Sequence, residues 1–255
     1  MLTIILVSIL IALIFAPLGC LALWKKYIYF GDGLAHAAIL AGSISAILDL
    51  SLVYSGIITA IIFASLVFKF KNISGTNATI NLISSLMLSG ALILAIVNPS
   101  RININQLLFG DIISVSNYDL ITLGCVLIMV YSFIIIYYKH ILLIVLDRDI
   151  ACVKKIPVNF IELSFLILLS ISVFTTIKIV GSLLVTSILI IPAMSARLVS
   201  NTPLQMITIS IIFAGASNLG GLYISYLKDI PVAPVIIIVE SIIYLCCYLI
   251  SMRRK

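Results

Sequence analysis

The sequence predicts an all-α, polytopic integral membrane protein of about eight to nine transmembrane helices. Of its 255 residues 63% are hydrophobic and 9% are charged, far from the roughly 25% charged composition of soluble domains. The apolar runs are continuous rather than alternating, which favours helices over a barrel, because backbone groups in hydrocarbon must be hydrogen-bonded internally. No soluble domain, repeat or low-complexity tract interrupts them, so residues 1–255 form a single transmembrane domain.

Each predicted span is a run of about 20 apolar residues, the length that crosses a bilayer. Several runs are short and closely joined, which leaves the count at eight or nine. The expected spans are 2–24, 33–50, 52–68, 78–97, 118–138, 160–176, 179–196, 204–226 and 231–250.

Two connections are longer than a turn. The segment 98–120 opens with the helix-stopping pair Asn98-Pro99 and continues with an apolar stretch too short to cross. We expect a short re-entrant or surface helix near 103–114. The segment 139–162 mixes both charge signs with a proline, as a cytoplasmic connection would, and Glu162 at its end is expected to reach water by snorkelling.

The basic residues predict the orientation. With the N-terminus outside and the C-terminus in the cytoplasm, 12 of the 15 Lys and Arg residues fall in cytoplasmic connections, which satisfies the positive-inside rule. They are scattered singly rather than gathered in a stripe, so no nucleic-acid partner is expected. The five cysteines show no CxxC or Cys/His spacing, which gives no sign of a disulfide framework or a cysteine metal site.

The stretch GDGLAHAA places two metal-ligating residue types, Asp32 and His36, inside an apolar run. Residues four apart lie on the same face of a helix, so the carboxylate and the imidazole can meet one ion as half of a metal site. A second copy of the chain related by a two-fold axis would supply the other ligands. Alternatively, Asp32 is a helix N-cap and His36 a core histidine bonded to a neighbouring helix.

Glu240 is the other acid well inside a predicted span. It is either part of an ion pathway or a protonated acid bonded to Ser or Tyr neighbours, and the sequence leaves both open.

The segment 178–206 contains a third unusual pattern. Ser182 and Thr186 would let a neighbouring helix approach closely, and Pro192 is expected to kink or end the span. A brief cytoplasmic helix between this span and the next would be a docking surface for a soluble partner, and the alternative is an ordinary loop.

Four stretches, in this order, cover nearly the whole chain: YFGDGLAHAAILAG, INQLLFGDIISVS, the long segment from LDRDIACVKK to PAMSARLVS, and SYLKDIPVAPVIIIVESIIYL. Together they resemble the membrane permease subunits of ATP-binding-cassette importers for zinc, manganese and iron. The sequence IYFGD followed by LAHAA is more similar to the zinc members than to the manganese members.

The resemblance implies a homodimeric permease in a bacterial inner membrane that works with cytoplasmic ATPase subunits and an extracytoplasmic metal-binding protein. It places Asp32 and His36 on the path of a transported divalent metal, with no permanently bound cofactor. It also assigns contact with the ATPase to the region of Ser195, Arg197, Asn201 and Pro203.

The chain has no G-x-x-x-x-G-K-[ST] phosphate loop, so we expect a transport subunit without its own ATPase site rather than an enzyme.

Three other functions stay open at this point. A manganese or iron permease of the same family is one alternative. A proton-coupled secondary transporter that uses Asp32, His36 and Glu240 is another, and a structural membrane protein is the third.

Overall fold

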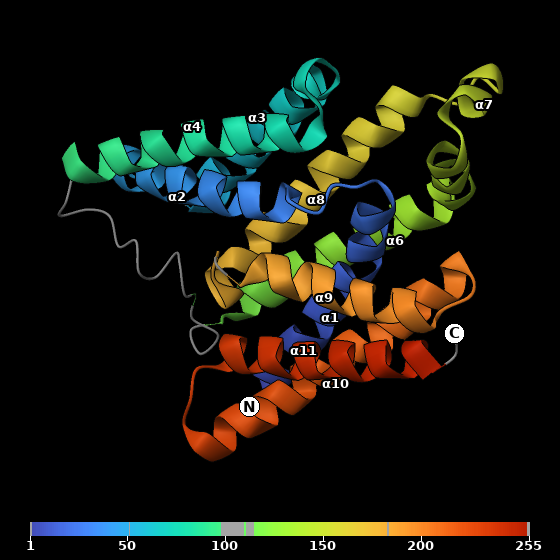
Figure 1. Ribbon diagram of the computed structural model, residues 1–255. Coiled ribbons are helices and arrows are strands. Elements are labelled where there is room, and N and C mark those ends of the chain that lie inside the picture. The colour runs from blue at the N-terminus through green and yellow to red at the C-terminus, as the bar shows by residue number, and fades with distance from the viewer. Residues whose placement is uncertain (1, 51, 98–109, 111–114, 183, 254–255) are drawn as a thin grey trace.

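The computed structural model describes residues 2–50, 52–97, 110, 115–182 and 184–253, and this part of the chain contains helices and no strands (Figure 1). Eight helices are long and apolar enough to cross a membrane, and α9 is a shorter apolar helix. The prediction of an all-α protein with eight to nine spans is confirmed. The helices are α1 (Leu2–Trp24), α2 (Phe30–Leu48), α3 (Leu52–Ser74), α4 (Thr76–Val97), α6 (Asn117–Leu146), α7 (Arg148–Val153), α8 (Val158–Val180), α9 (Val185–Val199), α10 (Pro203–Lys228) and α11 (Val232–Arg253).

Several boundaries differ from those expected. Helix α2 begins at Phe30 rather than at residue 33, and α8 continues to Val180, where Gly181 with a φ of 90° ends it. Pro192 lies inside α9 and does not end it, because helices packed around a proline inside a membrane protein can satisfy the freed backbone groups. The expected surface helix near 103–114 falls outside the described residues, apart from Gly110.

Helix α1 forms the centre of the molecule. It packs against α6, α8, α9 and α10, while α2, α3 and α4 form a group on one side and α10 and α11 pair on the other (Figure 1). A helix that is apolar all round is expected to be buried, and most of α1 is. Gly19 permits its contact with α9, since a Cβ atom there would lie 2.0 Å from the carbonyl oxygen of Leu189.

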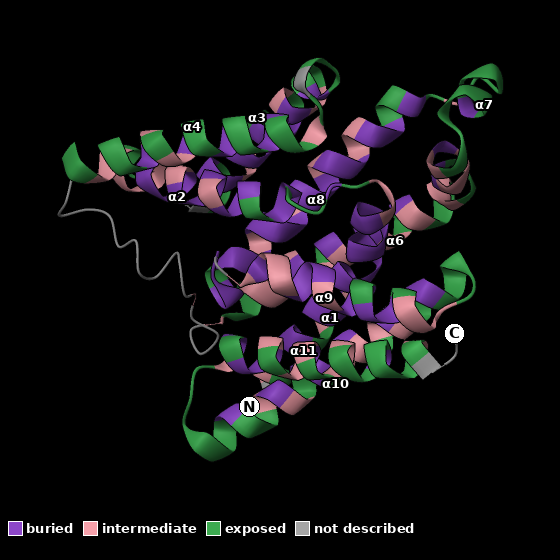
Figure 2. Ribbon diagram, viewed as in Figure 1, coloured by how far each residue is buried: buried purple, intermediate pink, exposed green. Residues whose placement is uncertain are grey.

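The outer faces of the peripheral helices carry large apolar side chains (Figure 2). Examples are Ile93 on α4, Ile135 on α6 and Leu249 on α11, each more than half exposed. Soluble monomers rarely expose apolar surface this extensively. Hydrocarbon is therefore the solvent of these faces, as expected for a multi-pass membrane protein.

A buried ion cluster ties several helix ends together. The carboxylate of Glu162, at the start of α8, lies 2.6 Å from Lys25 Nζ and 2.5 Å from Lys71 Nζ, with Arg148 at 3.8 Å. Lys71 also donates a hydrogen bond to the hydroxyl of Tyr27. Glu162 is 5% exposed, so the expectation that it would snorkel to water is wrong: two lysines from α3 and the end of α1 reach it inside the protein.

This cluster changes the proton affinities of the groups around it. Burial lowers the pKa of Lys25, and the hydrogen bond and charge of Glu162 act against that shift. Burial also raises the pKa of Tyr27, and the charge of Glu162 raises it further. Tyr27 therefore stays neutral and acts as an acceptor for Lys71.

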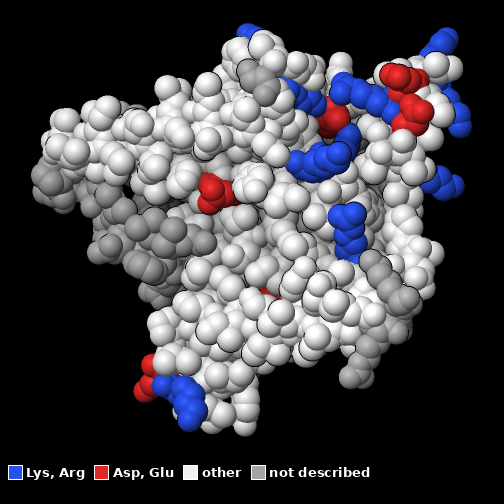
Figure 3. All heavy atoms as spheres, in the orientation of Figure 1, with Lys and Arg blue, Asp and Glu red and all other residues white. Residues whose placement is uncertain are grey.

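In Figure 3 most of the charged atoms gather at the upper right, a smaller group lies at the lower left, and only isolated charged side chains lie on the face between them. The Glu162 cluster marks one end. At the other end, Lys178 in the last turn of α8 lies 2.9 Å from Asp119 in the first turn of α6. The two ends of α8 thus mark opposite sides of the bilayer.

We predict that Glu162→Gln destabilises the fold strongly. The substitution leaves Lys25 and Lys71 buried without a counter-charge, and breaking a buried pair in this way costs about 3–5 kcal/mol. Thermal unfolding of the purified protein in detergent measures the effect as a lowered Tm.

The matched control is Lys69→Gln on α3, because Lys69 is exposed and such surface changes stay within about 0.5 kcal/mol. Equal Tm values for the two variants would show that the cluster contributes nothing to stability.

Candidate metal site

Helix α2 packs closely on its neighbours through small residues. A Cβ atom on Gly33 would lie 2.6 Å from the ring of Phe63 on α3, and one on Gly31 would lie 3.3 Å from the hydroxyl of Thr186 on α9. Small residues let membrane helices approach each other in this way. One side of α2 is therefore covered by its own chain.

Asp32 and His36 lie away from that covered side. Asp32 is exposed and His36 is half-buried, and their spacing of four puts both on one face of α2. Neither side chain makes a hydrogen bond or ion pair with any other residue in the described part of the chain. The carboxylate of Asp32 and the imidazole of His36 are therefore at least partly accessible, with no partner within the described residues.

Neither structural alternative for these residues is supported. The N-cap of α2 is Tyr29, and Asp32 lies in the first turn, where its charge suits the helix dipole. A core histidine would be bonded to a neighbouring helix, and within the described ranges His36 has no such partner.

The neighbours of α2 place Asp32 deep within the spans. The ring of Phe30 lies 5.2 Å from that of Phe63, which is near the middle of α3. On the other flank, Gly31 faces Thr186 in the first turn of α9. Asp32 is therefore separated from both charged ends of the molecule by apolar structure.

The described residues contain no complete metal site. No group of three or more His, Cys, Asp or Glu side chains that could hold a metal ion occurs among the described residues. A transition metal ion takes about four ligands. Asp32 and His36 offer two groups of the types that bind such ions, so this pair alone does not complete a site.

Glu240 does not lie on the helix face that carries Asp32 and His36. It is on α11, 2% exposed, and its Oε1 atom is 3.4 Å from the hydroxyl of Ser217 on α10. Both α2 and α11 pack on α9, and the described residues show no extensive packing of α2 against α11. The structure therefore does not bring Glu240 together with the other two residues.

The connection between α9 and α10 is a tight turn. Helix α9 runs to Val199 and α10 begins at Pro203, so of the two alternatives this described segment is an ordinary turn and not a separate short helix. Arg197, Asn201 and Pro203 are exposed, whereas Ser195 is buried and donates its hydroxyl proton to the carbonyl of Ile191.

Two side chains that the sequence reasoning did not single out hold this turn. Thr202 accepts a hydrogen bond from the backbone N–H of Gln205, and the Gln205 side chain accepts one from the N–H of Asn201. The spacing Thr-x-x-Gln before an apolar run is a helix-start signature and could have predicted the turn. The turn lies beside the end of α1, where Trp24 Nε1 contacts Met206 Sδ at 3.2 Å.

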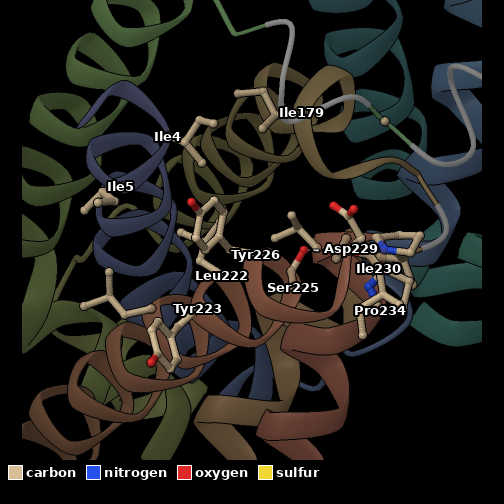
Figure 4. A pocket seen from close by; sticks show the side chains of 16 residues that line it. Ile4, Ile5, Ile179, Leu222, Tyr223, Ser225, Tyr226, Asp229, Ile230 and Pro234 are labelled. Carbon is tan, nitrogen blue, oxygen red and sulfur yellow. Dashed lines mark hydrogen bonds between the residues drawn. The ribbon is translucent and has the colours of Figure 1, made fainter. Parts of the chain in front are cut away.

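A cavity of about 980 Å³ opens at the end of the molecule opposite the Glu162 cluster. Its lining is mainly apolar and comes from α1, α10 and the start of α11, and Figure 4 shows the side chains of Ile4, Tyr226 and Asp229 around it. Asp32 and His36 do not line it. It is separate from the candidate metal site.

A family model described as the ABC 3 transport family matches residues 1–251. The chain belongs to the ABC 3 transport family. This membership agrees with the number and arrangement of the helices, and it makes the protein a transmembrane permease component of an ATP-binding-cassette transporter.

Three comparisons place the chain within this family. A high-affinity zinc uptake system membrane protein, ZnuB, from Buchnera aphidicola subsp. Acyrthosiphon pisum is 31% identical over 98% of this chain and 95% of its own length. The manganese import system permease protein ScaB from Streptococcus gordonii is 27% identical over 97% of this chain and 90% of its own. The solved structure of PsaBC from Streptococcus pneumoniae in complex with Fab superposes with a TM-score of 0.85 and 25% identity, covering 96% of this chain and 90% of that one.

Proposed function

We propose that this permease imports a divalent transition metal, with zinc as the first candidate, across a bacterial inner membrane, and that Asp32 and His36 bind the ion in transit. The observation that carries this proposal is the pair itself: a carboxylate and an imidazole on one outward face of α2, free of partners in the described chain and deep within the spans. Ionisable groups in such places generally mark an ion path.

A second copy of the chain would complete the site. If the two α2 helices meet at a two-fold axis, each contributes Asp32 and His36, and the ion gains the four ligands that Zn²⁺ prefers. Carboxylate and imidazole also accept Mn²⁺ and Fe²⁺. We favour zinc because of the similarity to ZnuB proteins, and the similarity to ScaB keeps manganese as the second candidate.

We further propose that a separate cytoplasmic ATPase drives transport and docks on the α9–α10 turn. This turn presents Arg197, Asn201 and Pro203 at the surface, while Ser195 supports it from within α9. Thr202 and Gln205 hold it in one shape, as a force-transmitting contact requires. An extracytoplasmic metal-binding protein would deliver the ion on the opposite side.

Membership of the ABC 3 transport family argues against a proton-coupled secondary transporter. In that alternative Asp32, His36 and Glu240 would exchange protons along one path. Helices α2 and α11 both pack on α9 but not extensively on each other in the described chain, so a direct relay between them is not supported. A purely structural role leaves the free ligand atoms of Asp32 and His36 without an explanation.

We predict that His36→Ala and Asp32→Asn each reduce metal uptake at least about tenfold, since even outer-shell changes at metal sites cost 10–100-fold. The measurement is uptake of radioactive zinc by cells at low zinc concentration, with membrane levels of each variant checked by blotting. Asn keeps the size and the capping ability of Asp but loses its charge.

Asp49→Asn is the matched control, because it makes the same change at the other end of α2. Asp49 has a φ of 53°, a conformation that Asn also tolerates, so uptake should be unchanged. Full uptake by Asp32→Asn at normal protein levels would remove Asp32 from the ion path.

We predict that Arg197→Ala lowers metal transport per ATP hydrolysed in the reconstituted complex with its ATPase. The exposed guanidinium lies next to the α9–α10 turn, so its loss should weaken the contact without disturbing the fold. Lys154→Ala removes an exposed cation from another connection and should leave transport unchanged. Equal effects of the two substitutions would place the ATPase contact elsewhere.

We predict an N-outside, C-inside orientation, which native Cys152 can report. Cys152 is exposed in α7, next to Arg148 of the Glu162 cluster. In right-side-out membrane vesicles, an impermeant thiol reagent should reach it only after the membrane is opened. A cysteine introduced at Tyr118, with Cys152 replaced by Ser, should react at once, and the reverse pattern would invert the assigned orientation.

A further inference from the structure

A second acid lies within the spans, and the proposed metal path does not use it. Glu240 on α11 is 2% exposed, its Oε2 atom has no hydrogen-bond partner, and its Oε1 atom has one contact, at 3.4 Å from Ser217 Oγ. No Lys, Arg or His in the described part of the chain forms an ion pair with it. Its charge, if it had one, would be uncompensated.

The hydroxyl of Ser217 lies between two acceptors. It has a single proton, and its Oγ atom is within hydrogen-bonding distance of the carbonyl oxygen of Ala214, at 3.0 Å, and of Glu240 Oε1, at 3.4 Å. An ionised Glu240 and the carbonyl would both compete for that one proton. A neutral Glu240 removes the competition, because its carboxyl group can donate to Ser217 Oγ while the hydroxyl donates to Ala214.

The surroundings favour the same protonation state. An unpaired carboxylate is costly to bury, and such a group neutralises itself by taking up a proton. Glu162 is equally buried but remains a carboxylate, because Lys25 and Lys71 supply positive charge within 2.6 Å. Glu240 has no comparable partner among the described residues.

Other titratable groups lie on the helices that contact Glu240, but none of them reaches it. Helices α9 and α10 pack against α11, and their titratable side chains are all exposed and make no hydrogen bond or ion pair with Glu240 in the described structure. They are Arg197, Tyr223, Tyr226 and Lys228.

We propose that Glu240 is an intramembrane proton-binding site, in which one proton per subunit is held between α10 and α11 by the carboxyl group and Ser217. The next residue of α10, Asn218, donates to the backbone oxygen of Ser8 on α1, and its own Oδ1 atom and Ser8 Oγ have no partner. Unpartnered oxygens thus occur on both sides of this part of α10, which is the kind of polar surrounding that a buried neutral acid needs. The site is independent of which metal the permease carries.

Infrared spectroscopy of the full-length protein in lipid vesicles tests this assignment. At neutral pH the wild-type protein should show the carbonyl stretching band of a neutral carboxylic acid, and Glu240→Gln should lose it. Ser217→Ala should shift the band to higher frequency, because the acid then lacks its acceptor. Ser241→Ala is the matched control, since its hydroxyl bonds to Ile237 within α11, and it should leave the band in place.

Dicyclohexylcarbodiimide, which reacts with neutral carboxyl groups within membranes, gives a second readout. Mass spectrometry should find the adduct on Glu240 and not on the paired Glu162. Loss of carboxylate bands instead of the acid band in Glu240→Gln would overturn the proposal. Protection of Glu240 from the reagent by sodium would also overturn it, because the resident ion would then be a metal cation.

Discussion

The position of the candidate metal site depends on one buried carboxylate. Glu162 binds Lys25 at the end of α1 and Lys71 near the end of α3, and so holds these helices against the start of α8. Only a short connection separates Lys25 from Phe30, where α2 begins. Fixing Lys25 therefore fixes the start of α2, and with it the depth at which Asp32 and His36 lie.

The spans could be predicted from the sequence because hydropathy is a local property, whereas the Glu162 cluster could not. Glu162 is 137 positions from Lys25 and 91 from Lys71, and no spacing along one helix relates them. Considered alone, an acid near a helix end is expected to turn toward water. The lysines that reach it inside the protein become visible only when three helices are packed together.

The candidate site was predictable in part. Helical periodicity places Asp32 and His36 on one face of α2, but whether that face looks into the chain or out of it depends on packing. The structure decides this through Gly31 and Gly33, which bring the opposite side of α2 against α9 and α3. The sequence likewise left open whether Pro192 ends its helix, since a proline stops a helix in water more readily than inside a packed membrane protein.

Four described acids lie within the candidate spans, and Asp119 pairs with Lys178 near a helix end. The other three meet the cost of leaving water in three different ways. Glu162 is paired with lysines, and Glu240 in our proposal holds a proton. Asp32 has neither solution within its own chain, and it points out of the subunit beside His36. Because the other carboxyl groups are already neutralised, our proposal assigns Asp32 to the incoming metal ion.

The incompleteness of the Asp32–His36 pair suits transport better than a finished site would. Four ligands fixed in one chain form a closed site of the structural type, which holds its ion permanently. Conduction requires binding that is strong enough for entry and weak enough for release. If the four ligands are divided between two subunits, any motion that separates the two α2 helices removes half of them at once. The affinity can then fall within one step of the transport cycle, without rearrangement of the fold that surrounds each α2.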